Sequence, residues 1–309
     1  MLRIATRGSP LALWQARHVA KSLKADASDL EVELLELTTK GDKILDQALS
    51  KVGGKDLFVK EIEHALLDGR AAVAVHSLKD VPTELPDGLV ITAYPQREDP
   101  RDALVSPKGY TLETLPEGAR IGTCSLRRAA QMLRRRPDLK IEEIRGNVQT
   151  RLKRLEERGM DATLLAYAGL LRLELANLAS EVFDPSVCLP AIGQGILAVE
   201  TRADDGETNA RVRKLDHGPS RAAALAERGF LHHLEGGCQV PIAGHATVAG
   251  DRIELRGLVS TLDGSRVIEG VESGAVEEAS EVGIRLAKAL LGQGAKEILD
   301  ALKQPQATG

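Results

Sequence analysis

The sequence predicts an α/β protein with two hinged, doubly wound α/β lobes and a small C-terminal α+β domain that contains a three-stranded antiparallel sheet. Apolar runs typical of buried strands, such as 71–75, lead repeatedly into short polar turns and then into helical patterns. The chain has 309 residues, which exceeds the usual size of one hydrophobic core. After residue 240 the pattern changes to strands separated by Gly-Asp and Asp-Gly turns, which is typical of hairpins.

The composition limits the possible functions. Aromatic residues make up only 2% of the chain, so the cores must consist of aliphatic side chains, and base-stacking platforms are not expected. The three cysteines, Cys124, Cys188 and Cys238, show no CxxC spacing, which argues against a disulfide framework and for a reducing compartment. We see no signal peptide and no run long enough to span a membrane. We therefore expect a cytoplasmic protein with no membrane partner.

The charge is distributed unevenly. The net charge is −4, but residues 120–158 contain 12 basic and 5 acidic residues, a local charge of +7 that leaves −11 for the rest. A local basic surface indicates a local anionic partner. Aromatic residues are absent from this stretch, whereas nucleic-acid-binding surfaces usually interleave them with basic residues. We therefore expect a polyanionic small molecule and no nucleic acid.

The first lobe begins with a predicted strand at 2–6 and a helix at 11–23, followed by a strand at 31–37. Between the first two, Arg7, the N-cap residue Ser9 and Pro10 form a turn whose free N–H groups suit an anion. A plain capped turn with a solvated arginine explains the same residues equally well.

The next segment, 42–55, ends in a glycine pair flanked by Lys51 and Lys55. Such a segment is either a mobile lid or a solvated loop, and the sequence leaves both possibilities open. From Phe58 the apolar spacing predicts a helix, with Asp56 as its N-cap.

The apolar run 71–75 indicates a strand buried on both faces of a parallel sheet. In open α/β sheets ligands bind beyond the carboxyl ends of strands, where Ser77, Lys79 and Asp80 would lie. Asp80 is the best candidate for a catalytic carboxylate, although a capped turn in which it pairs with Lys79 explains it equally well. His76 has no second histidine at metal-ligand spacing, so we interpret it as structural.

After a strand at 89–94, a charged segment at 95–101 indicates a domain boundary. Two further units follow, a strand at 120–122 with a helix at 126–136 and a strand at 141–144 with a helix at 148–157. Both helix N-termini carry arginines, so we expect a carboxylate or phosphate cradle there. Its members are Arg127, Arg128, Arg145 and Arg151. Arg134, Arg135 and Arg136 are expected instead to serve the helix C-terminus and solvent.

The remaining elements complete three predicted domains. A strand at 161–170 leads to Arg172, and the glycine-rich segment 189–200 turns into a strand that returns to the first lobe. A helix at 220–234, strands at 245–249, 252–259 and 266–270, and helices at 277–291 and 295–302 follow, and we expect the last residues to be disordered. We therefore divide the chain into 1–95 with 194–215, 100–190, and 217–309.

A cysteine after two glycines is the most unusual feature of the last domain. Gly236 and Gly237 allow the backbone before Cys238 to take a positive φ or a close approach, and Pro241 restricts the exit. The pattern indicates a thiol that is presented rather than buried, although an ordinary loop cysteine remains the alternative.

Taken together, six ordered motifs resemble the porphobilinogen deaminase family. They are Thr6-Arg7-x-Ser9-Pro10-Leu11-Ala12, Gly53-Gly54-Lys55-x-Leu57-Phe58, Ala74-Val75-His76-Ser77-x-Lys79-Asp80-Val81-Pro82, Gly122-Thr123-x-Ser125-Leu126-Arg127-Arg128, Arg145-Gly146-Asn147 and Leu234-Glu235-Gly236-Gly237-Cys238. Two positions depart from the family pattern: Cys124 replaces a serine, and Glu174 stands where a glycine often follows Arg-Leu.

The resemblance implies an activity and a cofactor. The family joins four porphobilinogen molecules head to tail with loss of ammonia, on a dipyrromethane cofactor linked to a cysteine by a thioether, and releases hydroxymethylbilane by hydrolysis for haem biosynthesis. It implies lobes like those of periplasmic binding proteins and a monomer without a metal ion. Each pyrrole carries an acetate and a propionate, so a growing chain needs a basic cleft.

The resemblance also assigns residues, by their match to the family motifs. Cys238 would carry the cofactor and Asp80 would be the catalytic carboxylate. The residues implied to bind the cofactor are Ser77, Lys79, Thr123, Ser125, Arg127, Arg128, Arg145 and Gly146. Those implied to bind substrate are Arg7, Ser9, Gln15, Arg145, Arg151, Arg172 and Gln194, and those of an active-site loop are Lys51, Lys55 and Phe58.

Two other classes fit parts of the pattern. Two hinged lobes around an anion site also describe a cytoplasmic small-anion-binding protein of the solute-binding type, which needs no catalytic Asp80. A Cys-His hydrolase or a metal enzyme could use His232, His233 and Cys238, but adjacent histidines point to different faces of a helix and no acidic third ligand is evident.

Overall fold

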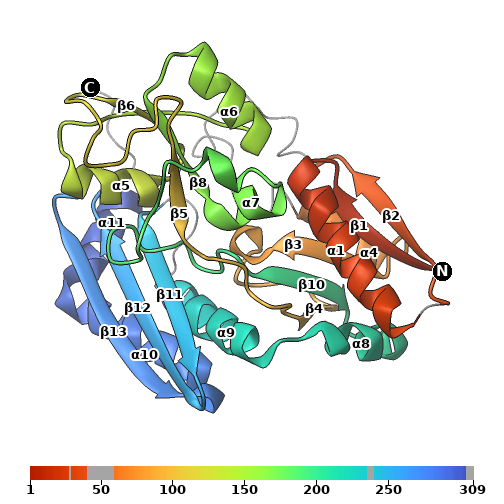
Figure 1. The fold of residues 1–309 in the computed structure, drawn as a ribbon. Helices are drawn as coiled ribbons and strands as arrows, with labels where there is room; N and C mark the ends of the chain where they lie inside the picture. The colour runs from red at the N-terminus through yellow and green to blue at the C-terminus, as the bar shows by residue number, and fades with distance from the viewer. Residues whose placement is uncertain (28, 40–58, 235–239, 304–309) are drawn as a thin grey trace. The chain divides into compact units, whose positions relative to one another are not determined.

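The computed structural model describes residues 1–27, 29–39, 59–234 and 240–303, and these form two compact units (Figure 1). The first unit contains Met1–Asp99, Ala168–Leu175 and Gln194–Arg221. The second contains Pro100–Tyr167, Ala176–Gly193 and Ala222–Gly309. The predicted loop at 42–55, the cysteine segment around Cys238 and the last six residues lie outside the described residues. The prediction that Asp56 is the N-cap of the next helix is wrong, because helix α4 begins at Lys60 and its N-cap is Val59.

The first unit is built on a five-stranded sheet with the order β2-β1-β3-β10-β4. The strand β1 runs parallel to β2 and β3, whereas β10 runs antiparallel to β3 and β4. The predicted burial of the strand in 71–75 is confirmed, but the predicted parallel sheet is wrong, because the sheet is mixed. The predicted return of the chain after the glycine-rich segment is confirmed, because β10 lies between β3 and β4. The strands are β1 Leu2–Arg7, β2 Val32–Leu37, β3 Val73–Ser77, β4 Leu89–Ala93 and β10 Leu197–Arg202.

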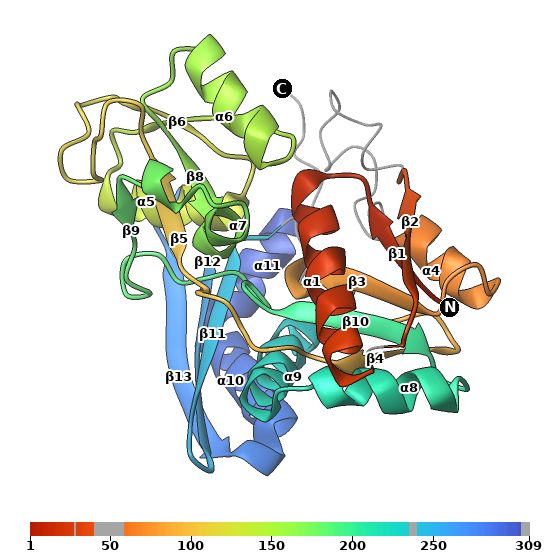
Figure 2. The ribbon, with the colours of Figure 1, turned by 45° about the vertical axis from the view of Figure 1, so that its right-hand side comes forward.

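Helices cover both faces of this sheet (Figure 2). Side chains alternate along a strand, so Ile4 of β1 packs in the core cluster with helix α1, whereas its neighbour Ala5 packs in the cluster with helix α4. This arrangement is the doubly wound lobe that the sequence predicts. The helices of the unit are α1 Pro10–Asp26, α4 Lys60–Leu67, α7 Tyr167–Arg172 and α8 Gly206–Val212.

The second unit contains another five-stranded sheet, ordered β7-β6-β8-β5-β9. The strand β6 is parallel to β7 and β8, and β5 is antiparallel to β8 and β9. The predicted strand at 161–170 is too long, because β8 ends at Ala166 and helix α7 follows directly. The elements are β5 Asp102–Val105, β6 Arg120–Gly122, α5 Leu126–Arg135, β7 Lys140–Glu142, α6 Val148–Glu157, β8 Ala162–Ala166 and β9 Glu181–Val182.

The same unit contains the predicted antiparallel sheet, with the order β11-β12-β13. Helices α9 and α10 lie very close to each other, since a Cβ added at Gly283 would approach the backbone oxygen of Ala226 to 2.1 Å. The elements are α9 Gly218–His233, β11 Ile242–Ala249, β12 Arg252–Ser260, β13 Val267–Ala275, α10 Ala279–Leu290 and α11 Lys296–Lys303.

These sheets confirm the predicted fold class. Each of the three predicted domains contributes the strands of one sheet, while the second α/β sheet and the antiparallel sheet belong to one compact unit. The division into three domains therefore stays a proposal. Of the helices in the described part of the chain, none is both long enough and apolar enough to cross a membrane.

Candidate functional site

A hollow at one edge of the first sheet contains five of the predicted site residues. Its empty space, open solvent included, is about 440 Å³. The predicted residues among its lining are Arg7, Ser9, Gln15, Ser77 and Asp80. They come from the carboxyl ends of β1 and β3 and from the first turns of α1, which is where open α/β sheets bind ligands.

The start of α1 has the capped geometry that the sequence predicts. Ser9 is the N-cap, its Oγ accepts a hydrogen bond from the backbone N–H of Ala12 at 3.4 Å, and Pro10 follows as the first helical residue. One turn later, the amide Nε2 of the buried Gln15 donates to Ser77 Oγ at 2.8 Å. This bond fixes α1 to the end of β3, so both predicted positions lie in one place.

Asp80 ends a short 3-10 turn, Leu78–Asp80, directly after β3. Its side chain is exposed, and within the described part of the chain the carboxylate has no hydrogen-bond or ion-pair partner. Lys79 Nζ lies 3.4 Å from Gln194 Oε1, so the alternative in which Lys79 pairs with Asp80 is wrong. A carboxylate without an internal partner is available to a ligand.

His76 has the structural role that the sequence predicts. Its Nε2 lies 3.0 Å from Glu200 Oε2, and both side chains are buried between β3 and β10. Among the described residues, no three His, Cys, Asp or Glu side chains are grouped so that they could hold a metal ion.

Arg172, at the end of α7, is held in the first unit by several contacts. Its Nη2 donates to the backbone oxygen of Gly195 at 2.7 Å, and its guanidinium lies 5.7 Å from the ring centre of Trp14. Burial lowers the pKa of Arg172 to about 10, and the nearby Glu98 opposes this shift. The group still carries a positive charge at neutral pH, so it can bind a carboxylate.

In the second unit, two strand-to-helix turns lie side by side after the parallel strands β6 and β7. Ser125 caps α5 by accepting from the N–H of Arg128 at 3.4 Å, and Asn147 caps α6 by accepting from the N–H of Thr150 at 2.9 Å. Thr123 is buried at the first turn, with its Oγ1 accepting from the N–H of Ser125 at 3.1 Å.

Arg151 joins these two turns. Its Nε donates to the backbone oxygen of Gly146 at 2.8 Å, and its Nη2 lies 3.8 Å from Cys124 Sγ. Gly146 has a φ of +106°, and a Cβ there would lie 2.5 Å from Thr150, so only glycine fits. Arg145 pairs with the more exposed Glu143. The predicted residues of both turns are therefore neighbours.

Arg127 and Arg128 lie inside the second unit, which the sequence did not predict. Asp102, fully buried at the start of β5, accepts from Arg127 Nη1 at 2.5 Å and from Arg128 Nη2 at 2.7 Å. Each arginine also donates to a backbone oxygen, of Leu189 and Leu164 respectively. Asp102 was missed because it lies 25 residues before Arg127, although an aspartate at the start of an apolar strand is itself a signal.

Comparison with known proteins identifies the family. The family model described as "Porphobilinogen deaminase, dipyromethane cofactor binding domain" matches residues 2–210, and "Porphobilinogen deaminase, C-terminal domain" matches residues 222–292. The chain belongs to the porphobilinogen deaminase family. This confirms the resemblance seen in the sequence motifs.

Curated relatives in the porphobilinogen deaminase family match almost the whole chain. Porphobilinogen deaminase of Syntrophotalea carbinolica is 54% identical over 301 residues, covering 97% of this chain and 96% of the relative. That of Syntrophomonas wolfei is 51% identical over 298 residues, covering 96% and 97%. Among solved structures, a nutrient binding protein from Burkholderia cenocepacia bound to methionine is 15% identical, covers 70% of this chain and 91% of its own, and has a TM-score of 0.43, which is too low to support an inference.

The residues around Asp102 fit a cofactor that carries carboxylates. Two guanidinium groups face one buried carboxylate, which leaves one positive charge in excess. Arg127 Nε is buried and has no hydrogen-bond partner among the described residues, and an unsatisfied buried donor costs about 1–3 kcal/mol. A bound carboxylate would supply both the missing charge and the missing acceptor. The predicted anchor Cys238 and the loop residues Lys51, Lys55 and Phe58 lie outside the described residues.

Proposed function

We propose that this protein is a transferase that joins four porphobilinogen molecules head to tail, with loss of ammonia, and then releases hydroxymethylbilane by hydrolysis. Dipyrromethane, attached through Cys238, is the primer. Membership of the porphobilinogen deaminase family supports this activity. The observation that carries the catalytic assignment is the carboxylate of Asp80, which has no hydrogen-bond or ion-pair partner among the described residues and lines one hollow with Arg7, Ser9 and Gln15.

In this proposal Asp80 donates and accepts a proton and stabilises a positive charge. The C–N bond of the substrate's aminomethyl group breaks, ammonia leaves after gaining a proton, and the remaining pyrrole is an electron-poor cation. The carboxyl group of Asp80 donates that proton, and the resulting carboxylate stabilises the cation. After the new C–C bond forms, the same carboxylate removes the α-proton of the accepting ring, so the proton count returns to its starting value.

The basic and amide side chains bind substrate and product carboxylates. Arg172 is positively charged and fixed by Trp14 and Gly195, so it can act as a rigid carboxylate ligand. The helix N-termini at Ser9, Ser125 and Asn147 add backbone N–H donors. When bound, the dipyrromethane supplies the free α-carbon that accepts the first unit, and Arg127, Arg128, Lys79 and Arg145 would hold its carboxylates.

The alternative, a small-anion-binding protein of the solute-binding type, is less well supported. It uses the same anion sites but assigns no role to Asp80. In addition, curated relatives of nearly equal length are named porphobilinogen deaminase. A cytoplasmic location and a monomeric state are part of the proposal.

The first test is the intact mass of the denatured protein, measured for the parent and for Cys238→Ser. We expect the parent to exceed its calculated mass by two condensed pyrrole units and the variant to match it. A parent without this excess is then incubated with porphobilinogen and weighed again. If no mass is gained and no ammonia is released, the proposed function is wrong.

The second test isolates the role of Asp80. Replacing it with asparagine should lower turnover at least about 100-fold, because general acid–base groups typically contribute about 10²–10⁴ to the rate. The mass excess of the cofactor should persist, and Asp80→Glu should keep part of the activity because the charge remains. The control is Asp68→Asn, an exposed aspartate whose only ion-pair partner among the described residues is Arg70. Turnover of Asp80→Asn at the level of this control would contradict the assignment.

A further inference from the structure

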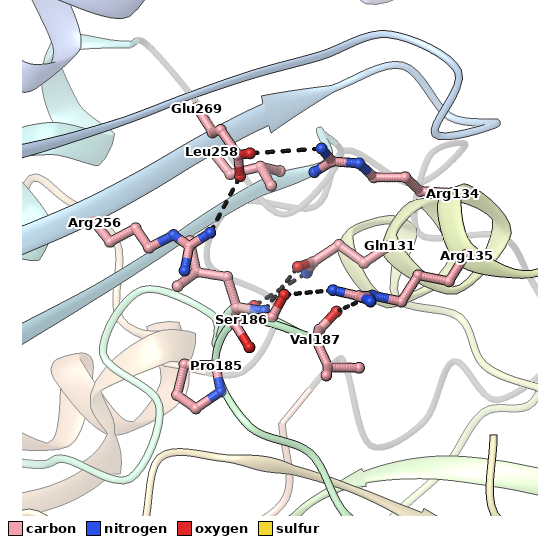
Figure 3. Close-up of a pocket in the computed structure, with 10 residues that line it drawn as sticks. Gln131, Arg134, Arg135, Pro185, Ser186, Val187, Arg256, Leu258 and Glu269 are labelled. Carbon is pink, nitrogen blue, oxygen red and sulfur yellow. Dashed lines mark hydrogen bonds and ion pairs between the residues drawn. The ribbon is translucent and has the colours of Figure 1, made fainter. Parts of the chain in front are cut away.

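A second hollow, in the second unit, is lined by an excess of positive charge (Figure 3). Its empty space, open solvent included, is about 270 Å³. Arg134 and Arg135 come from the last turn of α5, Arg256 from β12, and Glu269 from β13. Three guanidinium groups and one carboxylate leave two positive charges. Neither the proposed catalysis nor the predicted cofactor sites use these residues.

The guanidinium groups of Arg134 and Arg256 both reach Glu269, from different elements (Figure 3). The Arg134 Nη2 lies 3.5 Å from Glu269 Oε1, and Arg256 Nη2 lies 3.4 Å from Glu269 Oε2. These contacts are long compared with the 2.7–2.9 Å that is usual for charged pairs. Within the described part of the chain, neither arginine has another polar partner, so most of their N–H donors are available.

The wall around these groups is rigid. Gln131 of α5 donates to the backbone oxygen of Leu189 at 3.0 Å and accepts from its N–H at 2.7 Å. Arg135 donates to the oxygens of Ser186 at 2.5 Å and Val187 at 3.2 Å. The hairpin between β12 and β13 touches α5 so closely that a Cβ on Gly264 would lie 2.2 Å from the oxygen of Ala130. These contacts hold the Arg135 side chain and the part of α5 from which Arg134 extends.

Other charges near the hollow do not cancel its excess. Arg256 and Arg101 both help to hold the pKa of Asp184 below its usual value, after the larger effect of hydrogen bonds from Ser186. Counting Asp184 together with Arg101 leaves the total unchanged at two positive charges. Backbone oxygens bind Arg135 without neutralising it.

We propose that this hollow is an accessory binding site for a small oxyanion with at least two negative charges. The anion displaces the carboxylate of Glu269 and connects Arg134 of α5 with Arg256 of β12, and Arg135 adds charge at its edge. Guanidinium groups suit such a ligand, because their planar fork binds carboxylate or phosphate oxygens in pairs. A di- or tricarboxylate and a phosphate share this chemistry.

The test is calorimetric titration of the cofactor-loaded protein with citrate and, separately, with inorganic phosphate at constant ionic strength, since salt screens exposed charges. We expect a saturable accessory event that weakens at least about tenfold, or about 1.4 kcal/mol, in Arg134→Gln/Arg256→Gln. In Glu269→Gln the same event should be about threefold to tenfold tighter, because the internal competitor is gone. The probe that binds more tightly shows whether the site prefers a carboxylate or a phosphate ligand.

Two controls make the outcome specific. Arg285→Gln removes an exposed arginine of similar accessibility that pairs with Glu272, and it should leave the event unchanged. Arg7→Gln should abolish any citrate binding at the predicted substrate site, whereas the accessory event should remain. A failure of this proposal is therefore distinguishable from a failure of the proposed function. Both arginines are partly exposed, so the double variant should keep its stability to within about 0.5 kcal/mol and its turnover to within about twofold. Equal binding by parent and double variant, or no saturable binding by the parent, overturns the proposal.

Discussion

Glu174 is the only residue other than glycine with a positive φ in the described part of the chain, at +60°. It follows the last turn of α7, where the N–H of Leu175 donates to the oxygen of Leu170 and the N–H of Glu174 to that of Leu171. These two bonds define a Schellman motif, whose left-handed position usually holds glycine. Glu174, the departure from the family pattern, therefore holds a strained backbone conformation close to Arg172.

Glu174→Gly should stabilise the protein. A left-handed conformation costs an L-residue about 1–2 kcal/mol, which glycine avoids. About 0.5–1 kcal/mol of this gain is lost again, because glycine has more conformational freedom in the unfolded chain. The exposed carboxylate makes no hydrogen bond or ion pair with the described residues, so little else is lost. We expect the thermal midpoint to rise by about 1–3 °C. Glu174→Ala keeps the strain and should not raise the midpoint; an equal rise would contradict this explanation.

A substitution in the buried cluster of Asp102, Arg127 and Arg128 should destabilise the protein. In protein without the cofactor, Asp102→Asn removes the buried carboxylate that pairs with both Arg127 and Arg128. Breaking a buried charge network in this way typically costs about 3–5 kcal/mol, which chemical denaturation measures directly. The matched control is Glu272→Gln, whose exposed pair with Arg285 is worth about 0.2–1 kcal/mol. Similar losses in the two variants would show that the cluster is not a structural unit.

At the scale of residues, the sequence predicted local capping better than it predicted the surroundings of the candidate site residues. Arg127 and Arg128 follow a helix N-cap, which is a local pattern, and so they were expected to face a ligand. Their partner Asp102 is brought to them by the pairing of β5 with β8, a long-range contact that no local pattern contains. Ser9 was predicted correctly as an N-cap because capping depends only on the next three residues.

At the scale of elements too, bounds that depend on a local signal were predicted correctly, whereas features without a local signal were not. Helix α6 has the predicted bounds, Val148–Glu157, because Asn147 caps its start. The strand predicted at 161–170 was wrong beyond Ala166, since a buried strand followed by a buried helix gives one continuous apolar run. The antiparallel direction of β10 was not predictable either, because strand direction depends on where the chain re-enters the sheet.

Helices α1 and α7 are connected through Trp14 and Arg172, and this contact has a kinetic consequence if Arg172 binds substrate as proposed. A cation–π contact is worth about 0.5–2 kcal/mol, so Trp14→Leu should raise KM for porphobilinogen about twofold to thirtyfold. Trp14 positions Arg172 and does not touch the reacting atoms, so kcat should change by less than about twofold.

The control for this prediction is Trp14→Phe, which keeps an aromatic face and should restore most of the affinity. Steady-state kinetics with purified holoprotein separates the two constants. A fall in kcat with an unchanged KM, or no difference between the leucine and phenylalanine variants, would show that Trp14 has only a packing role.

For the whole molecule, the candidate site residues divide between the two units. Asp80 and the hollow beside it belong to the first unit, whereas the basic turns at Thr123–Ser125 and Arg145–Asn147 belong to the second. The sequence places the excess of +7 charge within 120–158, which lies inside the second unit. It also placed Arg134 and Arg135 at a helix end facing solvent, but not the hollow that they form with Arg256, because β12 is more than 100 residues away along the chain.

The three cysteines provide a test of the whole assembly, because each is in a different chemical state. Cys188 is buried, and burial raises the pKa of its thiol to about 12, so at about pH 8 only about one molecule in 10⁴ is the reactive thiolate. Cys124 is partly exposed and lies beside Arg151. Cys238 carries the cofactor as a thioether in the proposed function and then has no free thiol. Native holoprotein treated with iodoacetamide should therefore gain a single label, on Cys124.

Unfolding changes this count in a defined way. Denatured holoprotein should gain two labels, on Cys124 and Cys188, because the thioether survives unfolding, whereas denatured protein without the cofactor should gain three. Cys124→Ser should reduce the native count to zero, and the unmodified fraction can be followed by intact mass. Three labels on denatured protein that retains the cofactor mass would exclude a thioether at any cysteine, and rapid labelling of Cys188 in the native state would contradict its burial.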